Sequence, residues 1–473
     1  MIADLKPYAE YKESGLPWLG QLPTHWGLIP NRGLVRRRKV LVGRRHGDYR
    51  LLSLTKQGVI VRDISTGKGK FSSDMGSSQE VRNGDLVFCL FDVPETPRTV
   101  GLARHDGMIT GAYTVFESLG RGSSEYFELF YRAMDDRKLL SPLYSGLRNT
   151  IPAERLLGTK TPQPPPDEQA AIVRFLDWAT GKLDRAIRAK RKVIALLNEQ
   201  KQAIIHRAVT RGLDPTVPLK PSGIDWTPKI PQDWDQYPLR RLAICENSGS
   251  YGHDPSVGLR ELPVATTAQI NRDGRFDVVR MPRRGFTAAE VERFCCKPGD
   301  ILVVKSSGSA ANVISGKCGI VEPDTPLFVY SNFLARFSAN VSLVQPRYLF
   351  LLLTSYITRE RVKRMVSTTT YPNLRMGEYR GALLPVPPLG EQQRILEAVR
   401  VEVASVEQAA SRLEREIELL REYRTRLFAD VVTGKLDVRE AAARLPDEAP
   451  LDSVEDAADL GDDIESEAEE IEA

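Results

Sequence analysis

Cysteine and histidine are scarce in this chain of 473 residues, which has 5 of each. The cysteines form no CxxC pair, and they stand at Cys89, Cys245, Cys295, Cys296 and Cys318. The histidines show neither an HExxH motif nor a spacing typical of metal ligands. These absences argue against a disulfide scaffold and a zinc enzyme, and they favour the reducing cytoplasm.

Long apolar runs are missing as well. No run approaches the roughly 20 residues needed to cross a bilayer. The charged start, MIADLKPYAEYKES, lacks the apolar stretch of a signal peptide. We therefore expect a soluble cytoplasmic protein. At roughly 100–200 residues per domain, its length suggests two to four domains.

The common catalytic motifs are also absent. The chain has no GxxxxGK[ST] phosphate loop, no GxSxG nucleophile elbow and no Asn/Asp-Pro-Pro-aromatic motif of amino-methyltransferases. Asp85 and Asp300 each follow a glycine before an apolar run, with no nuclease-like lysine nearby, so we interpret both as turn residues. The sequence predicts a protein that recognises a partner without chemistry of its own.

The net charge of +4 hides an asymmetry. Residues 446–473 hold 13 acidic residues and no basic ones. Without them, 49 of the 62 acidic residues remain against 66 Lys and Arg, so the body carries +17. Such a basic body favours a polyanionic partner. The tail lacks aromatics, so we expect it to be disordered, serving either solubility or the shielding of the basic body from nonspecific nucleic acid.

The chain contains an internal repeat. SGLPWLGQLPTHW at 14–26 recurs as SGIDWTPKIPQDW at 222–234, and PQPPPDEQAAI at 162–172 recurs as PVPPLGEQQRI at 385–395. The second match continues without a gap to 214 and 437, with 15 of 53 positions identical. Between these conserved pieces the two halves resemble each other only loosely. Such a repeat predicts internal pseudo-twofold symmetry.

Two proline-free segments, 167–210 and 390–433, follow the Pro-rich stretches. Each has apolar residues spaced by four and three over about six heptads, which is typical of a coiled coil. Each helix would be about 66 Å long, and the two most simply pack antiparallel. Lys201 and Arg424 occupy equivalent seam positions, and we expect them to snorkel or to contact a partner chain. The alternative is two unrelated amphipathic helices, each packed on its own domain.

The predicted fold class is therefore α+β, with two mixed α/β domains separated by two long antiparallel helices. The expected domains are residues 1–161, the first helix at 162–214, residues 215–384, the second helix at 385–440, and the acidic tail at 441–473. Basic, Ser/Gly-rich loops such as 66–70 and 305–317 lie in the variable domains. They suit contact with phosphates and base edges, although for any single charge there a solvated surface is the favoured interpretation.

This duplicated order resembles the specificity (S) subunit of type I restriction–modification systems. TTTYPNLRMGEYRGALLPVPPLGEQQRI at 368–395 looks like that family's closing recognition signature running into its central helix. TPQPPPDEQAAI at 161–172 is a weaker first copy, in which Leu147–Thr150 stand where the second copy has its threonine run. The segments 16–26 and 225–234 resemble the opening motif, and 299–321 and 327–337 fit the middle of a recognition domain.

The resemblance implies that each variable domain is a target-recognition domain for one half of a split DNA sequence. The two helices would set the unspecified gap. Two modification (M) subunits, carrying S-adenosylmethionine, would methylate adenine N6, and two restriction (R) subunits could add translocation and cleavage driven by ATP with Mg²⁺. No cofactor is expected in this chain, and the acidic tail is not part of the family pattern.

Candidate residues follow for each role. For DNA contact we expect residues of the basic loops and of the closing signature, namely Lys68, Lys70, Arg148, Asn149, Lys305, Ser306, Ser307, Asn312, Lys317, Thr369, Tyr371, Asn373 and Arg375. For contact with M subunits we expect the outward helix faces and Glu168, Gln169, Glu391 and Gln392. These four residues are equally compatible with a role in starting and docking the helices. No catalytic or metal-binding residue is expected.

Two other functions remain open from the sequence alone. A self-contained nuclease or methyltransferase would need an active site that carries none of the usual motifs. A scaffold that joins proteins through its paired helices would leave the duplicated basic domains without a purpose. DNA-free assembly that is independent of salt would favour the scaffold.

Overall fold

The computed structural model describes residues 5–16, 18–62, 75–224, 226–271, 273–307, 313–356, 364–368 and 372–446. Contacts divide the chain into two compact units, one of Met1–Lys190 with Arg415–Ala473 and one of Arg191–Glu414. Each unit therefore holds one mixed α/β region and about half of each long helix. The predicted contacts Lys68, Lys70, Asn312, Thr369 and Tyr371, and the tail beyond 446, lie outside the described residues.

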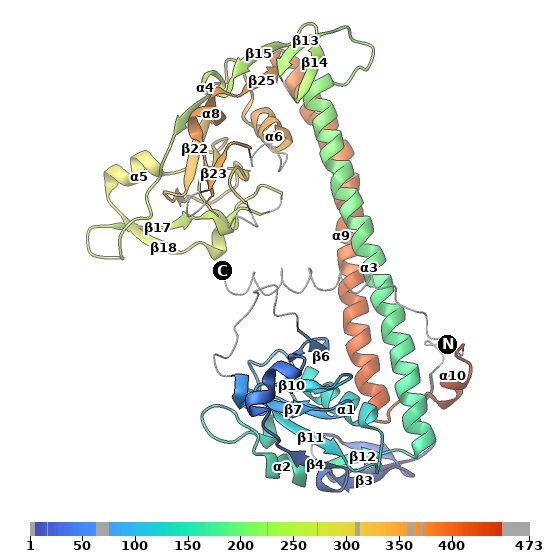
Figure 1. Ribbon diagram of the computed structural model, residues 1–473. Helices are drawn as coiled ribbons and strands as arrows, with labels where there is room; N and C mark the ends of the chain where they lie inside the picture. Colours follow the sequence, from blue (N-terminus) through green and yellow to red (C-terminus); the bar gives the residue numbers. More distant parts are fainter. Residues whose placement is uncertain are drawn as a thin grey trace. The chain divides into compact units, whose positions relative to one another are not determined.

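The first unit begins with short strands and ends its α/β region in the first long helix (Figure 1). Its strands are β1 (Tyr11–Glu13), β2 (Gln21–Pro23), β3 (Gly27–Pro30), β4 (Val35–Arg38), β5 (Leu52–Thr55), β6 (Gly58–Val61), β7 (Gln79–Val81), β8 (Leu86–Phe88), β9 (Val100–Leu102), β10 (Gly107–Ile109), β11 (Thr114–Ser118) and β12 (Lys160–Gln163). Its helices are α1 (Ser124–Asp136), α2 (Ala153–Gly158), the first part of α3 (Pro166–Arg211), the end of α9 (Leu389–Val432) and α10 (Arg439–Ala443).

The second unit repeats this plan. Its strands are β13 (Leu219–Ile224), β14 (Thr227–Pro231), β15 (Asp235–Pro238), β16 (Ala243–Glu246), β17 (Arg260–Ala265), β18 (Arg283–Phe286), β19 (Ile301–Val304), β20 (Cys318–Ile320), β21 (Val329–Tyr330), β22 (Leu334–Ala339), β23 (Val366–Thr368), β24 (Pro372–Leu374) and β25 (Leu383–Val386). Its helices are α4 (Leu239–Leu242), α5 (Ala288–Phe294), α6 (Pro346–Tyr356) and α8 (Met376–Gly381), with the end of α3 and the start of α9.

The main sheets of the two units have the same strand order. In the first unit the order is β4-β11-β8-β9, and in the second it is β16-β22-β19-β20. All neighbours in both sheets are antiparallel. Strand order is set by which apolar strands pack together, so two halves with little sequence in common still form the same sheet. The predicted internal repeat is confirmed.

A second strand pair closes each α/β region. The strand directly after the second tryptophan of the opening motif pairs with the strand directly before the Pro-rich stretch. In the first unit β3 pairs with β12, with Gly27 opposite Gln163. In the second unit β15 pairs with β25, with Asp235 opposite Val386. The conserved pieces thus meet at the point where the long helix leaves the domain.

The long helices have nearly the predicted bounds. α3 has 46 residues and α9 has 44, and each begins and ends within one residue of the proline-free segments 167–210 and 390–433. Gly212 and Gly434 follow the two C-termini with φ of 72° and 76°, a left-handed conformation that glycine adopts without strain. Glu168 and Glu391 lie in the first turns, where negative charge suits the helix dipole.

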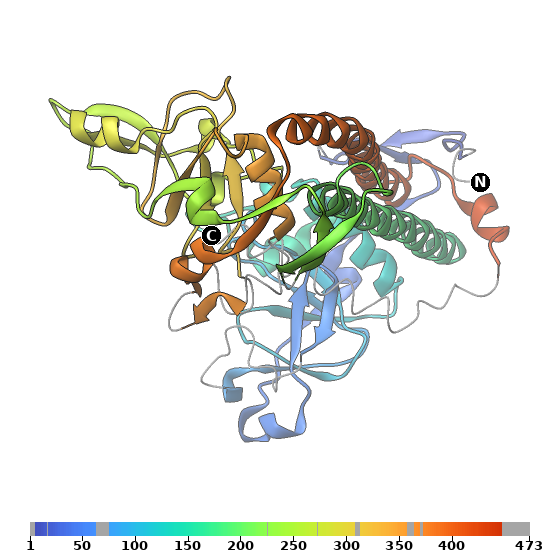
Figure 2. The same ribbon diagram turned by 90° about the horizontal axis from the view of Figure 1, so that it is seen from above.

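The two helices run antiparallel in each unit and lie side by side in both views (Figures 1 and 2). In the first unit Arg424 of α9 meets Asp184 of α3, and in the second Lys201 of α3 meets Glu407 of α9. The seam residues Ile172, Leu176 and Leu183 are buried in the core of the first unit, and Ile395, Val399 and Val403 in that of the second. The predicted antiparallel coiled coil is confirmed, and both seam cations form ion pairs with the facing helix.

The Gly-Asp pairs form turns as predicted. Gly84 and Gly299 have φ of 90° and 89°. Asp85 is buried and accepts a hydrogen bond from the Arg82 amide, and Asp300 is buried and accepts one from the Lys297 amide. Burial is the main cause that raises the pKa of Asp85. Each aspartate therefore fixes the turn that leads into a central strand, β8 or β19.

Candidate nucleic-acid interface

A glutamate in the first turn attaches each long helix to its own domain. Trp26 donates its indole N–H to Glu168, with 3.0 Å between Nε1 and Oε1. Tyr8 also donates to Glu168, and His25 Nε2 lies 2.8 Å from Oε2. Burial and then the bond to Glu168 raise the pKa of Tyr8 well above its usual value. In the second unit Trp234 donates to Glu391 at 3.1 Å.

The neighbouring glutamines repeat one set of bonds. Gln169 donates to the Pro164 carbonyl at 2.8 Å and accepts from the Ser123 amide, at the start of α1, at 2.8 Å. Gln392 donates to the Pro387 carbonyl at 2.9 Å and accepts from the amide of Gln345, which precedes α6, at 2.8 Å. The two bonds tie the start of each long helix to a second helix of its domain.

These bonds bear on the four residues expected at a partner interface. Glu168, Gln169 and Gln392 are buried, with exposed fractions of 3%, 4% and 0%. Their polar atoms contact their own domain, which fits the alternative interpretation that they start and dock the helices. Glu391 is half-buried. Contact of these residues with an M subunit stays a prediction.

In the second domain, the fold brings together two segments that lie far apart in the sequence. Ser306 pairs with Asn373 in an antiparallel bridge, and the Leu374 amide donates to the Lys305 carbonyl at 2.7 Å. Ser315 donates to the Pro372 carbonyl at 2.8 Å. The end of β19 and the strand β24 therefore form one surface, which we call the β19–β24 patch and define as Lys305, Ser306, Ser307, Asn373 and Arg375.

The polar groups of the β19–β24 patch are partly exposed. Asn373 and Arg375 are exposed, whereas Lys305, Ser306 and Ser307 are half-buried. Partial burial lowers the pKa of Lys305. Arg375 is held by Glu378, with 2.6 Å between Nη1 and Oε1. Lys317 is also half-buried. Its carbonyl accepts a hydrogen bond from the amide of Val304, the last residue of β19, at 2.8 Å.

The first domain has a corresponding surface. The Ile151 amide donates to the Leu90 carbonyl at 2.8 Å, and the Asp92 amide donates to the Arg148 carbonyl at 3.0 Å. Counting from the Gly-Asp turns, Leu90 corresponds to Lys305 and Asp92 to Ser307. Counting back from the Pro-rich stretches, Ile151 corresponds to Leu374. The segment with Arg148 and Ile151 therefore lies next to the end of β8, as the segment with Pro372 and Leu374 lies next to the end of β19.

Arg148 and Asn149 thus share a surface with a residue that the sequence analysis did not select. Arg148 forms an ion pair with Asp92, with 2.8 Å between Nη2 and Oδ2. The constant spacing from the Gly-Asp turn, which aligns Asp92 with Ser307, was the signal that could have identified it. We call Asp92, Arg148 and Asn149 the β8 patch.

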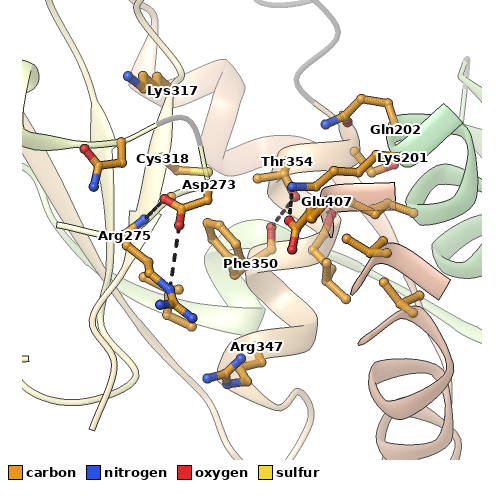
Figure 3. A pocket seen from close by; sticks show the side chains of 18 of the residues that line it. Lys201, Gln202, Asp273, Arg275, Lys317, Cys318, Arg347, Phe350, Thr354 and Glu407 are labelled. Atoms are coloured by element: carbon orange, nitrogen blue, oxygen red, sulfur yellow. Dashed lines mark hydrogen bonds and ion pairs between the residues drawn. The ribbon is translucent and has the colours of Figure 1, made fainter. Parts of the chain in front are cut away.

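A cavity of about 920 Å³ opens in the second unit between α6, the end of α3 and the start of α9 (Figure 3). Phe350 of α6 and Cys318 of β20 line it, together with the ion pair of Lys201 and Glu407. Burial raises the pKa of Cys318 to about 12, so its thiol stays protonated at neutral pH. The predicted contact Lys317 also lines this cavity.

Two further findings concern metal sites and membranes. Across the described residues, no three His, Cys, Asp or Glu side chains are grouped so that they could hold a metal ion. No helix in the described part of the chain is long and apolar enough to span a bilayer.

No family model matches the chain. The MjaVIII specificity subunit of a type I restriction enzyme from Methanocaldococcus jannaschii is 22% identical over 293 residues, which cover 59% of this chain and 63% of that protein. The EcoKI specificity subunit from Escherichia coli K12 is 22% identical over 227 residues, 44% of either chain. The match thus spans less than two thirds of these relatives.

A solved chain from work on complex assembly and conformational transition of a type I restriction–modification system has a similar fold. The TM-score is 0.60, with 13% sequence identity, and the match covers 87% of this chain and 98% of that one. The fold class predicted from the sequence is confirmed. The chain resembles type I restriction enzyme specificity subunits, as its repeated motifs indicate.

Proposed function

We propose that this chain is the DNA-recognition subunit of a type I restriction–modification complex and has no catalytic residues of its own. Each α/β domain reads one half of a split, asymmetric target. The two long helices, which both pass from one unit into the other, set the unspecified gap between the halves.

The duplicated surface is the observation that carries this proposal. The β8 patch and the β19–β24 patch are built at the same point of two sheets with the same strand order. Two similar surfaces in one chain can bind two half-sites together, and the binding of one raises the effective concentration of the other. Half-sites about one helical turn apart, ~34 Å, suit two similar domains on one face of DNA.

The chemistry of the patches fits DNA. Arg and Lys neutralise phosphates, and this part of the affinity depends on salt. Amide and hydroxyl groups such as those of Asn373 and Ser306 can discriminate between base edges. The patches mix both kinds of group, and the charge of +17 on residues outside the acidic tail favours association with a polyanion.

The partners follow from this function. Two M subunits would bring S-adenosylmethionine and methylate adenine N6 on each strand, and the target base would leave the stack to reach them. Two R subunits could add ATP- and Mg²⁺-dependent translocation and cleavage. The outward faces of α3 and α9, together with Glu391, are the proposed contacts for the M subunits. The complex would act on DNA in the cytoplasm.

The test is to express the chain with an M subunit encoded beside it, in a host without other adenine methylation, and to map N6-methyladenine across the genome. We expect one split motif, with two defined parts around a constant gap and a methylated adenine on each strand. An assembled complex that binds S-adenosylmethionine but methylates no defined motif would contradict the proposal. Methyl transfer or Mg²⁺-dependent cleavage by the isolated chain would instead indicate a self-contained enzyme.

A further inference from the structure

Arg148 is exposed and yet held in place. Its side chain is 77% exposed, and it meets Asp92 at two points. Nη2 lies 2.8 Å from Oδ2, and Nε lies 3.3 Å from Oδ1. The carboxylate therefore binds the edge of the guanidinium formed by Nε and Nη2. The edge formed by Nη1 and Nη2 faces outward.

The backbone around this pair is left-handed at two residues. Across the described residues, three residues other than glycine have positive φ, namely Asp92, Lys138 and Asn149. Asp92, with φ of 45°, is half of the pair, and Asn149, with φ of 44°, follows Arg148. Left-handed backbone is uncommon in residues with a Cβ, and it persists where the surrounding structure holds it and often where a site needs it. Here the hydrogen bond from the Asp92 amide to the Arg148 carbonyl, 3.0 Å long, holds Asp92 in this conformation.

The donors that remain on Arg148 form a defined pattern. A guanidinium has five N–H bonds in one plane. Asp92 takes the Nε–H and one Nη2–H, so the second Nη2–H and the Nη1–H beside it point outward in parallel. Two parallel donors match the N7 and O6 acceptors that guanine presents in the major groove, and no other base shows two acceptors there.

We propose that Arg148 reads a guanine in the first half-site and that Asp92 is the positioning residue that orients it. This inference rests on the proposed function and identifies one base of the target sequence. An ordinary surface ion pair is common and contributes little, but it does not require that the carboxylate bind the guanidinium at two points, as Asp92 binds Arg148 here. The pair lies beside the end of β8, and the β19–β24 patch lies at the equivalent position in the second domain.

The experiment uses the full chain in its complex with the M subunit. Arg148→Ala and Arg148→Lys remove the parallel donors, since lysine offers a single point charge. Asp92→Asn removes the carboxylate charge, and asparagine tolerates left-handed φ, so this variant should keep the local backbone conformation. Arg36→Ala is the matched control, because Arg36 is 70% exposed in the same domain and is paired with Glu117. For each variant the methylated motif is mapped, and methylation rates are measured on duplexes that carry each base at every motif position.

We expect the wild-type motif to contain a G·C pair in one half. Arg148→Ala and Arg148→Lys should lower discrimination at that pair roughly tenfold to a hundredfold, with other positions retained. Asp92→Asn should lower it less, at the same position, and Arg36→Ala should leave it unchanged. An Arg148→Ala motif identical to wild type would overturn the inference, as would a uniform loss on all sequences, which indicates a phosphate contact. If the wild-type complex methylates no motif, the proposed function itself fails.

Discussion

Lys201 on α3 and Glu407 on α9 form an ion pair, with 2.5 Å between Nζ and Oε1. Arg424 and Asp184 form the same pair in the first unit, also at 2.5 Å. Lys201 and Arg424 are 223 residues apart, as are Asp184 and Glu407, so each helix supplies the cation once and the acid once. The same contact thus joins the two antiparallel helices in each unit.

Reversal of this pair tests the register. Lys201→Glu places two acids opposite each other and should lower the free energy of unfolding by about 1 kcal/mol at low salt. The double variant with Glu407→Lys should recover most of the loss. Urea unfolding at low salt and at about 1 M salt measures this, because high salt screens exposed charges. A double variant as unstable as the sum of the single ones would show that the pair does not couple the helices.

The two Trp–Glu attachments should differ in strength. Glu168 is 3% exposed and contacts Trp26, Tyr8 and His25. Glu391 is half-buried. Removing a partner from buried polar groups costs their desolvation, so we expect Glu168→Ala to cost about 3 kcal/mol and Glu391→Ala about 1 kcal/mol. Equal losses in urea unfolding of the two variants would contradict this ranking.

The raised pKa of Glu391 predicts that the free energy of unfolding depends on pH. Burial is the main cause that raises the pKa of Glu391 above its usual 4.5, against the hydrogen bond from Trp234, which lowers it. The folded protein therefore binds this proton more tightly than the unfolded chain. Its contribution to stability is full below pH 4.5 and is lost as the pH rises from 4.5 through the folded pKa.

The variant Glu391→Gln cannot titrate and isolates this contribution. The free energy of unfolding of the wild type, relative to that of the variant, should fall as the pH rises above 4.5 and then level off. Unfolding curves of both proteins at several pH values give this difference. A difference that instead grows with pH would mean that the folded pKa lies below the usual value.

We expect Lys305 to contribute to the salt-dependent part of the affinity for DNA. Lys305→Ala should weaken binding to a duplex with the mapped motif and reduce the slope of log affinity against log salt by about one. Fluorescence anisotropy with the assembled complex measures both. Arg280→Ala is the control, because Arg280 is 85% exposed in the same unit, paired with Asp277 and outside the β19–β24 patch. Unchanged affinity and slope would remove Lys305 from the interface.

The long helices could be predicted almost completely from the sequence. Their ends follow from prolines before the first turn and glycines after the last, which act locally on the backbone. The seam follows from the period of the apolar residues. The roles of Gln169 and Gln392 could not be read in this way, because their bonds reach α1 and the segment before α6, and only folding brings these close.

By itself, then, the sequence determined the repeat, the two helices and their antiparallel pairing, because these depend on spacings within one segment and on the match between two. The tertiary structure decided which loops form a surface. Asp92 and Arg148 are 56 residues apart, and Ser306 and Asn373 lie on segments joined by a strand pairing. Such contacts arise when apolar strands pack into one sheet, and no local spacing in the chain encodes them.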